Sequence, residues 1–528
     1  MVKMLGVTEV NSPNNPRAVP ESWQQIDFPK KVKNQDILTN TRTLSRDQIA
    51  FCGALLGLLL SKGLALFPAY GLDDYVAVHQ DRHPLFYVSQ GRFTQAAIQV
   101  ALSTLGVTPT SIAWTSTLLF FIFAALAISS SLLYIARTRG NGFTFAAAGA
   151  LIGAHPYLTE YFTFRESLIT QGTAFGLLAL VFVFARYHEN TNEKLPRLHS
   201  LGWLAIPLVL LAGAQQTTFI VAFFVVLARI TVDSLWSSQQ RGFAAALRAN
   251  APVIFAFAAA IVIYVLAYKI CRNALSAALD TRGSIVALTE IIPRIAKVGD
   301  LTWKILIQSE PVLSAVPKIL LALIILFFLG KVGLKSPKIA AMIVCMTAAM
   351  YLGSVFLITI SAVWWPVPRA VYGVGFVYGV VLSVISLWLS HTEARQLSIG
   401  ALIVAIIFSF HSNAMLHDQA RLNRWDSWVA GGIAKDLLKK GISADQKVTL
   451  VGAKWRHPIG MRTLEGDLNA SALPVAWAAQ YLMMEVTGRS WNVDSVAQAE
   501  QCRNSPPWPA DESIKIISGS VFVCMGER

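Results

Sequence analysis

The chain has 528 residues, of which 54% are hydrophobic and only 14% are charged. Its mean hydropathy of +0.52 lies well outside the range of soluble globular proteins, so we predict a polytopic membrane protein. The formal net charge of +14 could suggest a nucleic-acid partner. Most Lys and Arg residues, however, lie in short segments between apolar runs, where basic residues encode membrane topology. We therefore expect no nucleic-acid partner.

Residues 1–46 are polar and contain four prolines without an apolar core, so we predict a cytosolic N-terminal arm and no cleavable signal peptide. Runs of about 20 apolar residues follow, the length that a helix needs to cross about 30 Å of hydrocarbon. We predict eleven such spans within a transmembrane domain at 47–413. They lie near residues 47–69, 110–136, 143–158, 167–187, 200–214, 217–235, 251–270, 312–330, 339–360, 370–390 and 397–413.

The connections between the spans alternate in charge along the chain. From the basic arm onward, every second connection is short and carries Lys or Arg, as the positive-inside rule expects of cytosolic segments. The opposite connections are longer and chemically mixed, and we predict them as the outer loops 70–109, 157–166, 271–311 and 361–369. An odd number of spans places the tail, residues 414–528, on the same outer face. If the host is a Gram-negative bacterium, this face is the periplasm, and the predicted location is the inner membrane with a cytosolic N-terminus and a periplasmic C-terminal domain.

Two adjacent carboxylates, Asp73 and Asp74, follow the first span directly. Such a pair at the mouth of a membrane helix is costly to desolvate and hard to keep fully ionised, so it tends to persist where chemistry needs it. Consecutive residues of a helix point about 100 degrees apart, so one carboxylate would face a substrate while the other orients a partner. The sequence leaves open which residue does which. Helix capping or a solvated loop is the alternative for both.

Ionisable residues gather at the predicted outer ends of the spans, whereas the span interiors are nearly free of charge. A transporter would be expected to hide ionisable residues near the bilayer midplane, in broken helices. Charges at the rim instead suit an enzyme that takes a lipid-linked substrate sideways from the bilayer. The histidines at this rim, His79 and His155, have no partner at metal-ligand spacing, so we predict no metal site there.

Three outer segments carry a resemblance to a known family. They are Gly71-Leu-Asp-Asp-Tyr-Val with Gln90-Gly-Arg-Phe, then His155-Pro-Tyr-Leu-Thr-Glu-Tyr-Phe-Thr-Phe-Arg-Glu-Ser, then Pro366-Val-Pro-Arg-Ala. In these motifs and in their order the chain resembles the Gtr-type glucosyltransferases of bacterial and phage O-antigen modification, members of the GT-C superfamily. It departs from the family at Glu166 and His155, where Asp and Asn are commonly found.

The resemblance implies a GT-C-like fold and a role in serotype conversion. The implied reaction transfers a hexosyl group from an undecaprenyl-phosphate sugar to O-antigen, lipopolysaccharide or a similar surface polysaccharide. Glucosyl is the hexosyl group that the resemblance favours. No cofactor is implied beyond this lipid-linked donor, and the use of a divalent metal stays open. Membrane lipids are the other expected partner.

This chemistry assigns roles to the rim residues. Asp73 or Asp74 would take the proton of the attacking sugar hydroxyl as the anomeric carbon becomes oxocarbenium-like. The phosphate leaving group calls for guanidinium groups at the membrane surface, and Arg92, Arg165 and Arg369 are the candidates. Each arginine could instead anchor a helix end among lipid head groups. Candidates for acceptor or sugar binding are Tyr75, Glu160, Glu166, Trp364 and Trp365, and for the tryptophans an interfacial belt is the alternative.

Residues 414–528 are mixed and polar in character. A helix near 418–440 and apolar strand-like runs at 447–452 and 514–517 predict a small soluble α/β domain. Cys502 and Cys524 share this tail, and on the outer face a disulfide between them is permitted, with two buried free thiols as the alternative.

Amphipathic surface helices are predicted in two of the outer loops. In 271–311, apolar residues from Ile285 to Val298 recur at helical spacing between basic ones, which is typical of a helix lying on the outer leaflet. A similar surface helix is predicted at 92–108.

Two alternative functions share the basic loops and the span count. One is a flippase or transporter for a glycolipid, and the other is a GT-C enzyme that uses another sugar or acceptor. Changing each Asp to Asn separates the first from a transferase, because only an enzyme that depends on the carboxylate loses sugar transfer.

Overall fold

The computed structural model divides the chain into two compact units, Met1–Leu44 and Ser45–Arg528. It describes residues 44–67, 69–80, 83–190, 197–236, 242–278, 280, 284–464 and 468–526. The predicted cytosolic arm at 1–46 therefore lies almost entirely outside the described residues.

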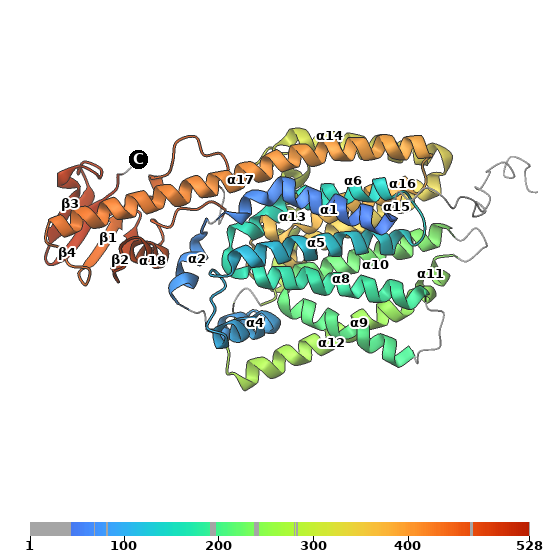
Figure 1. Cartoon of the computed structure of the whole chain (residues 1–528), viewed down its shortest axis with the longest axis horizontal. Helices are drawn as coiled ribbons and strands as arrows, with labels where there is room; N and C mark the ends of the chain where they lie inside the picture. The colour runs from blue at the N-terminus through green and yellow to red at the C-terminus, as the bar shows by residue number, and fades with distance from the viewer. Residues whose placement is uncertain are drawn as a thin grey trace, which may run out of the picture. The chain divides into compact units, whose positions relative to one another are not determined.

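Helices make up most of the second unit, and the longest of them run side by side (Figure 1). The α-helices are α1 (Arg46–Lys62), α2 (Leu72–His79), α3 (Pro84–Ser89), α4 (Phe93–Thr104), α5 (Ala113–Ala136), α6 (Gly142–Ala154), α7 (Pro156–Thr159), α8 (Leu168–Asn190), α9 (Arg197–Ala214), α10 (Gln216–Trp236), α11 (Phe243–Ala249), α12 (Ala251–Ala274), α13 (Ile291–Leu306), α14 (Ala315–Lys335), α15 (Pro337–Ile360), α16 (Gly373–Ser386), α17 (His391–Lys439) and α18 (Ala476–Thr487). Short 3₁₀ turns include η2 (Gly63–Leu66), η3 (Glu160–Thr163), η4 (Arg165–Ser167) and η7 (Pro368–Ala370).

The predicted spans correspond to the apolar helices of the structure. Within the described residues, eight helices are long and apolar enough to cross a membrane, and three shorter apolar helices lie at Gly142–Ala154, Gly202–Ala214 and Gly373–Ser386. Each of the eleven predicted spans overlaps one of them. The predicted fold class, an α-helical polytopic membrane protein with a small C-terminal α/β domain, is confirmed.

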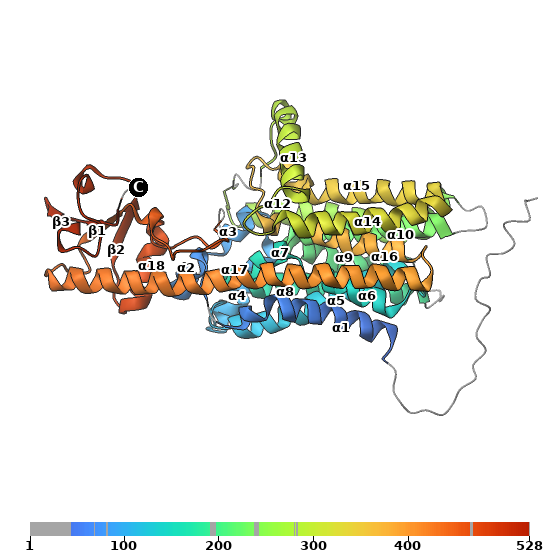
Figure 2. The ribbon, with the colours of Figure 1, turned by 90° about the horizontal axis from the view of Figure 1, so that it is seen from above.

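Helix α17 is a single helix of 49 residues that continues from the last predicted span into the C-terminal domain (Figure 2). We predicted a span ending at 413 and a separate helix near 418–440, so the predicted boundary at 414 falls inside α17. No Gly or Pro lies between Gly400 and Gly431, so nothing breaks the backbone there. Only the side chains change from apolar to polar, and composition alone does not mark the end of a helix.

The longest predicted outer loops contain short helices. Residues 70–109 form α2, α3 and α4, and α4 covers most of the surface helix predicted at 92–108. In 271–311, α13 runs across the direction of the spanning helices in Figure 2 and exposes 77% of Ile292. It begins at Ile291, later than the apolar pattern suggested. Residues 284–286 instead pair with 360–362, through Val286 N–H donating to the Ile360 carbonyl at 2.9 Å.

Helices α1 and α6 pack with their backbones almost in contact. A Cβ atom added at Gly57 would lie 2.5 Å from the carbonyl oxygen of Ala150, and one added at Gly53 would lie 2.4 Å from Cα of Ala146. These glycines are four residues apart and so lie on one face of α1, the arrangement that lets membrane helices approach closely. The pairing fixes the end of α1, from which the chain continues through η2 to α2.

The C-terminal domain is a four-stranded sheet packed against helices. Its strand order is β2 (Asn492–Val496), β1 (Lys447–Val451), β4 (Ser520–Cys524) and β3 (Ile514–Ile517), with β3 antiparallel to β4 and the other pairs parallel. The two strand-like runs of the sequence are β1 and β3. Val429 and Ile433 of α17 and Leu482 of α18 share a buried apolar cluster with Val448 and Val523 of the sheet.

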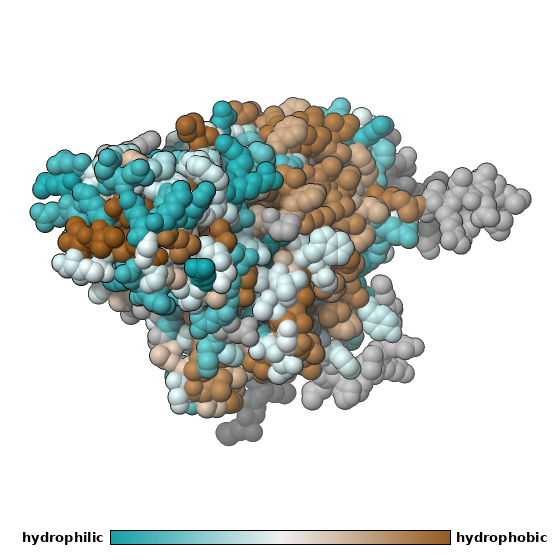
Figure 3. Space-filling model, turned by 60° about the vertical axis from the view of Figure 1, so that its left-hand side comes forward, coloured by the Kyte–Doolittle hydropathy of each residue, from teal (hydrophilic) through white to brown (hydrophobic). Residues whose placement is uncertain are grey.

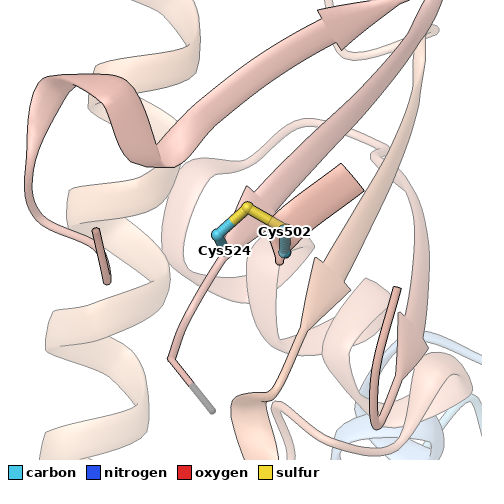
Figure 4. The surroundings of a disulfide bond; sticks show 2 residues. All are labelled: Cys502 and Cys524. Carbon is cyan, nitrogen blue, oxygen red and sulfur yellow. A yellow bond between two sulfur atoms is a disulfide. The ribbon is translucent and has the colours of Figure 1, made fainter. Parts of the chain in front are cut away.

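The surface of the molecule changes along α17. On the face drawn in Figure 3, hydrophobic side chains cover the bundle of helices, while mostly hydrophilic ones gather over the C-terminal domain. Within that domain a disulfide joins Cys502 to Cys524, at the end of β4 (Figure 4). It is the pair that the sequence analysis considered.

We predict that Gly57→Ala lowers the melting temperature of the purified protein, because the new methyl group must displace the backbone of α6. Overpacking of this kind typically costs about 1–3 kcal/mol. The matched control is Gly330→Ala in α14, where an added Cβ would meet no atom within 4 Å. Thermal unfolding in detergent measures both, and equal melting temperatures would contradict the close α1–α6 packing.

Candidate active site

A cavity of about 420 Å³ lies among the segments that the sequence predicts as outer loops. Asp73, Arg92, Glu166 and Arg369 are among its polar lining residues, and Trp365 also borders it. Residues Leu357, Ile358 and Ile360, at the end of α15, form an apolar wall. The structure thus brings five of the predicted site residues to one cavity, from segments that are almost 300 positions apart in the sequence.

Asp74 is fully buried and holds two backbone segments together. Its Oδ2 atom accepts a hydrogen bond from Gly71 N–H at 2.8 Å, and its Oδ1 atom accepts one from Glu166 N–H at 2.8 Å. Burial raises the pKa of Asp74 to about 6, although the N–H groups around the carboxylate act in the opposite direction. Asp74 caps α2 and ties it to η4, and it does not border the cavity.

Asp73 precedes Asp74 on the first turn of α2, so its side chain points in a different direction. It is partly exposed and borders the cavity. Sequence analysis expected one aspartate to face a substrate and the other to orient a partner, without assigning them. The geometry puts Asp73 at the cavity and Asp74 in the backbone framework.

Arg165 lies outside the cavity lining, with only 3% of its surface exposed. Its Nε donates to the Ala69 carbonyl at 3.2 Å, its Nη2 donates to the Phe67 carbonyl at 2.8 Å, and its Nη1 donates to the Ala65 carbonyl. Ala65 belongs to η2, and Phe67 and Ala69 follow it, so Arg165 supplies donors to backbone carbonyls where the helical structure ends. This geometry disagrees with the predicted role in binding a donor phosphate and gives Arg165 a structural role.

Arg369 borders the cavity and is held by Glu160, which is fully buried. Its guanidinium Nη1 lies 2.5 Å from Glu160 Oε1, and its backbone N–H donates to Glu160 Oε2 at 2.5 Å. The guanidinium carbon lies 4.3 Å from the ring centre of Phe164 and 4.6 Å from that of Trp365. Glu160, which we predicted to bind acceptor or sugar, instead positions Arg369 from behind.

Two other predicted sugar-binding residues lie away from the cavity. Tyr75 is 3% exposed and belongs to the apolar cluster of the C-terminal domain, where Asn423 donates a hydrogen bond to its hydroxyl. Trp364 packs under Arg294, whose guanidinium carbon lies 5.4 Å from the indole ring centre. The structure therefore gives Tyr75 and Trp364 packing roles, while Trp365 and Glu166 do line the cavity.

The cavity wall also contains a group of glutamines to which the sequence assigned no role. They are Gln90, Gln95, Gln171, Gln215 and Gln216. The sequence does contain a signal for this group, because Gln171, Gln215 and Gln216 interrupt or border apolar spans at their predicted outer ends. Burial of an amide there costs free energy unless the amide is hydrogen-bonded.

The lining combines two carboxylates, Asp73 and Glu166, with two guanidinium groups, Arg92 and Arg369, and with neutral amides. Such a site can bind an anionic group, accept a proton and hydrogen-bond to hydroxyl groups. In the part of the chain that the structure describes, no group of three or more His, Cys, Asp or Glu side chains is placed to hold a metal ion.

No protein-family model matches the chain, and no curated protein matches it. A solved oligosaccharyltransferase of Archaeoglobus fulgidus, in complex with Zn and sulfate, has 13% sequence identity and a TM-score of 0.37, covering 86% of this chain and 62% of its own.

A second structure shows a similar degree of likeness. The archaeal oligosaccharyltransferase AglB from Archaeoglobus fulgidus, in complex with an inhibitory peptide and a dolichol-phosphate, has 11% identity and a TM-score of 0.36, covering 85% of this chain and 64% of its own. This chain thus spans less than two thirds of the length of either protein. At TM-scores this low, the likeness supports no conclusion about activity.

We predict that Asp74 makes the stability of the protein depend on pH. Its pKa is raised from 3.8 to about 6 on folding, so the folded protein binds this proton more tightly than the unfolded chain. The contribution of Asp74 to the free energy of unfolding is therefore highest below pH 3.8, falls by a few kcal/mol as the pH rises to about 6, and is then constant.

Asp74→Asn removes this titration, so the difference in melting temperature between wild type and variant should change between pH 4 and pH 6 and be constant above it. Thermal unfolding of both proteins in detergent at a series of pH values measures that difference. Parallel profiles over the whole range would contradict the assignment.

Proposed function

We propose that the protein is a membrane glycosyltransferase of the periplasmic face of a bacterial inner membrane. It transfers a hexosyl group from an undecaprenyl-phosphate sugar to O-antigen, lipopolysaccharide or a similar surface polysaccharide. Glucosyl is the hexosyl group that we favour. The observation that carries the proposal is one cavity bordered by the Asp73 carboxylate and by the Arg92 and Arg369 guanidinium groups. The resemblance of the outer segments to Gtr-type glucosyltransferases supports the choice of sugar, donor and acceptor.

Asp73 is the general base in this proposal. Its carboxylate takes the proton of an acceptor hydroxyl while the oxygen of that hydroxyl bonds to the anomeric carbon of the donor. The bond between that carbon and the phosphate oxygen breaks, and its electron pair leaves with the polyprenyl phosphate. Asp74 is unsuited to this step, because both of its carboxylate oxygens accept backbone hydrogen bonds and it is shielded from the cavity.

Arg92 and Arg369 bind the phosphate and stabilise its negative charge as it leaves. Guanidinium groups suit this task because they hydrogen-bond to phosphate oxygens through a planar fork. Arg369 is held in advance by Glu160 and by two aromatic rings, so little reorganisation is needed during the reaction. Glu160 is thus a positioning residue.

The apolar wall of the cavity supports a lipid-linked donor. Leu357, Ile358 and Ile360 belong to α15, one of the helices long and apolar enough to cross a membrane. A polyprenyl chain beside α15 would bring its phosphate to the same cavity without leaving an apolar environment. A glycolipid flippase would need such a wall too, so the carboxylate is what separates the two functions.

We predict that Asp73→Asn lowers the rate of hexosyl transfer by roughly 100-fold or more, the usual contribution of a general base. Donor binding should persist, because the arginines are untouched. The assay follows transfer of labelled hexose from a polyprenyl-phosphate hexose to purified polysaccharide by the protein in lipid nanodiscs.

The matched control is Asp445→Asn, an exposed aspartate of the C-terminal domain. Unchanged transfer by the Asp73 variant would refute its role as base. Wild-type protein that moves the glycolipid across the bilayer without transferring sugar would favour the flippase.

Arg369 and Arg165 should differ in what their loss affects. Arg369→Lys should lower kcat for transfer by about 10²-fold, because lysine lacks the planar fork that binds a phosphate. The change in melting temperature should be smaller, because lysine keeps a positive charge beside the buried Glu160. Arg165→Ala should mainly lower the melting temperature, since it leaves three backbone carbonyls without their donor. Transfer kinetics and thermal unfolding of both variants measure this, and the opposite pattern would contradict the two assignments.

A further inference from the structure

Two glutamines of the cavity present side-chain oxygens that lack a hydrogen-bond partner. Gln171, near the start of α8, is 4% exposed, and Gln95, in α4, is 2% exposed. Both border the cavity, and the Oε1 atom of each is buried with no partner among the residues that the structure describes. A buried acceptor of this kind costs free energy until something donates to it, so both atoms indicate a bound group with hydrogen-bond donors.

A chain of hydrogen bonds fixes the orientation of the Gln171 amide. The Arg369 carbonyl can only accept, so the Tyr161 hydroxyl donates to it at 3.1 Å. Tyr161 in turn accepts from Gln215 Nε2 at 3.0 Å, which turns Gln215 Oε1 toward Gln171. Gln171 Nε2 donates to that oxygen at 3.4 Å. Flipping any amide would break this chain, so Gln171 offers the cavity an oxygen, which is an acceptor.

An acceptor and a guanidinium group select different parts of a ligand. An ionised phosphate has only acceptor oxygens, so it is bound by Arg92 and Arg369 and repelled by an amide oxygen. A sugar hydroxyl can donate to the amide. The hydrogen-bond chain also connects Gln171 to Arg369, so the two kinds of group share one rigid wall.

We infer that Gln171 and Gln95 form the sugar subsite of the donor, in which the amide oxygen of Gln171 accepts a hydrogen bond from one hydroxyl group of an uncharged hexosyl unit and the amide of Gln95 hydrogen-bonds to another. The inference rests on the proposed function and deepens it. It divides the cavity between arginines that recognise the phosphate of any polyprenyl phosphate and amides that recognise the sugar attached to it.

The test compares the affinity of the full-length protein in nanodiscs for two lipids, polyprenyl phosphate and polyprenyl-phosphate hexose. The variants are Gln171→Met and Gln95→Met, because methionine keeps the length of the side chain and suits a membrane helix but offers no amide oxygen. The two variants lie on different helices, and a melting temperature confirms that each is folded. Gln99→Met is the matched control, since Gln99 lies one turn after Gln95 on α4 and outside the cavity lining.

We expect each variant to bind the hexose-bearing lipid about 10-fold more weakly, the usual range for loss of a hydrogen bond to a buried acceptor. Affinity for bare polyprenyl phosphate should be unchanged, and Gln99→Met should match wild type for both lipids. Wild-type preference for the hexose-bearing lipid that survives in both variants would overturn the inference and leave the proposed function standing. Equal weakening for both lipids would also overturn it, because the glutamines would then act on the phosphate or on cavity shape.

A third lipid tests the charge of the sugar. If polyprenyl phosphate carrying an amino sugar binds more tightly than the hexose-bearing lipid, the subsite does not select an uncharged sugar, and this part of the inference fails. Wild-type protein that binds none of the three lipids would refute the proposed function, and the inference would fall with it.

Discussion

The site depends on a carboxylate that the substrate would never touch. Asp74 is enclosed by protein, which is tolerated because both its oxygens accept backbone hydrogen bonds, from Gly71 and Glu166. That contact joins the start of α2 to a segment over 90 positions later. On the same segment, the buried Glu160 binds the side chain and the backbone of Arg369. Two buried carboxylates thus tie three distant stretches of chain into one frame, and the cavity lies where these stretches meet.

The charged residues at this end of the bundle serve two purposes. Asp74 and Arg165 use their polar atoms on the backbone, so they determine where the surrounding segments lie. Asp73, Arg92 and Arg369 border the cavity, so a ligand bound there would lie beside them. The residues that bind the backbone hold the residues that line the cavity in place before any ligand arrives. The charged groups of the cavity are therefore preorganised, as catalysis by charge stabilisation requires.

The sequence was sufficient for the parts of the structure that the membrane itself constrains. Hydrocarbon thickness sets the length of a span, so the apolar runs predicted the helices well. The sequence did not indicate which of the two adjacent aspartates faces the cavity, because that depends on how tertiary contacts rotate α2. Arg165 and Arg369 look alike in sequence, but Arg165 donates to backbone carbonyls, whereas Arg369 pairs with the buried carboxylate of Glu160. The sequence did not indicate a binding role for the glutamines of the cavity, because whether an amide offers a donor or an acceptor depends on the direction of the hydrogen bonds around it.

Helix α2 is also held from its other side, by the C-terminal domain. Tyr481 of α18 donates a hydrogen bond to Gln80 at 2.6 Å, and Glu485 lies 2.9 Å from the His79 ring. Tyr75 is part of the apolar cluster of that domain. An isolated helix of eight residues would not be stable in water, so α2 owes its conformation to these contacts and to Asp74. The direction in which Asp73 points is therefore set jointly by the membrane helices and by a domain whose described residues do not line the cavity.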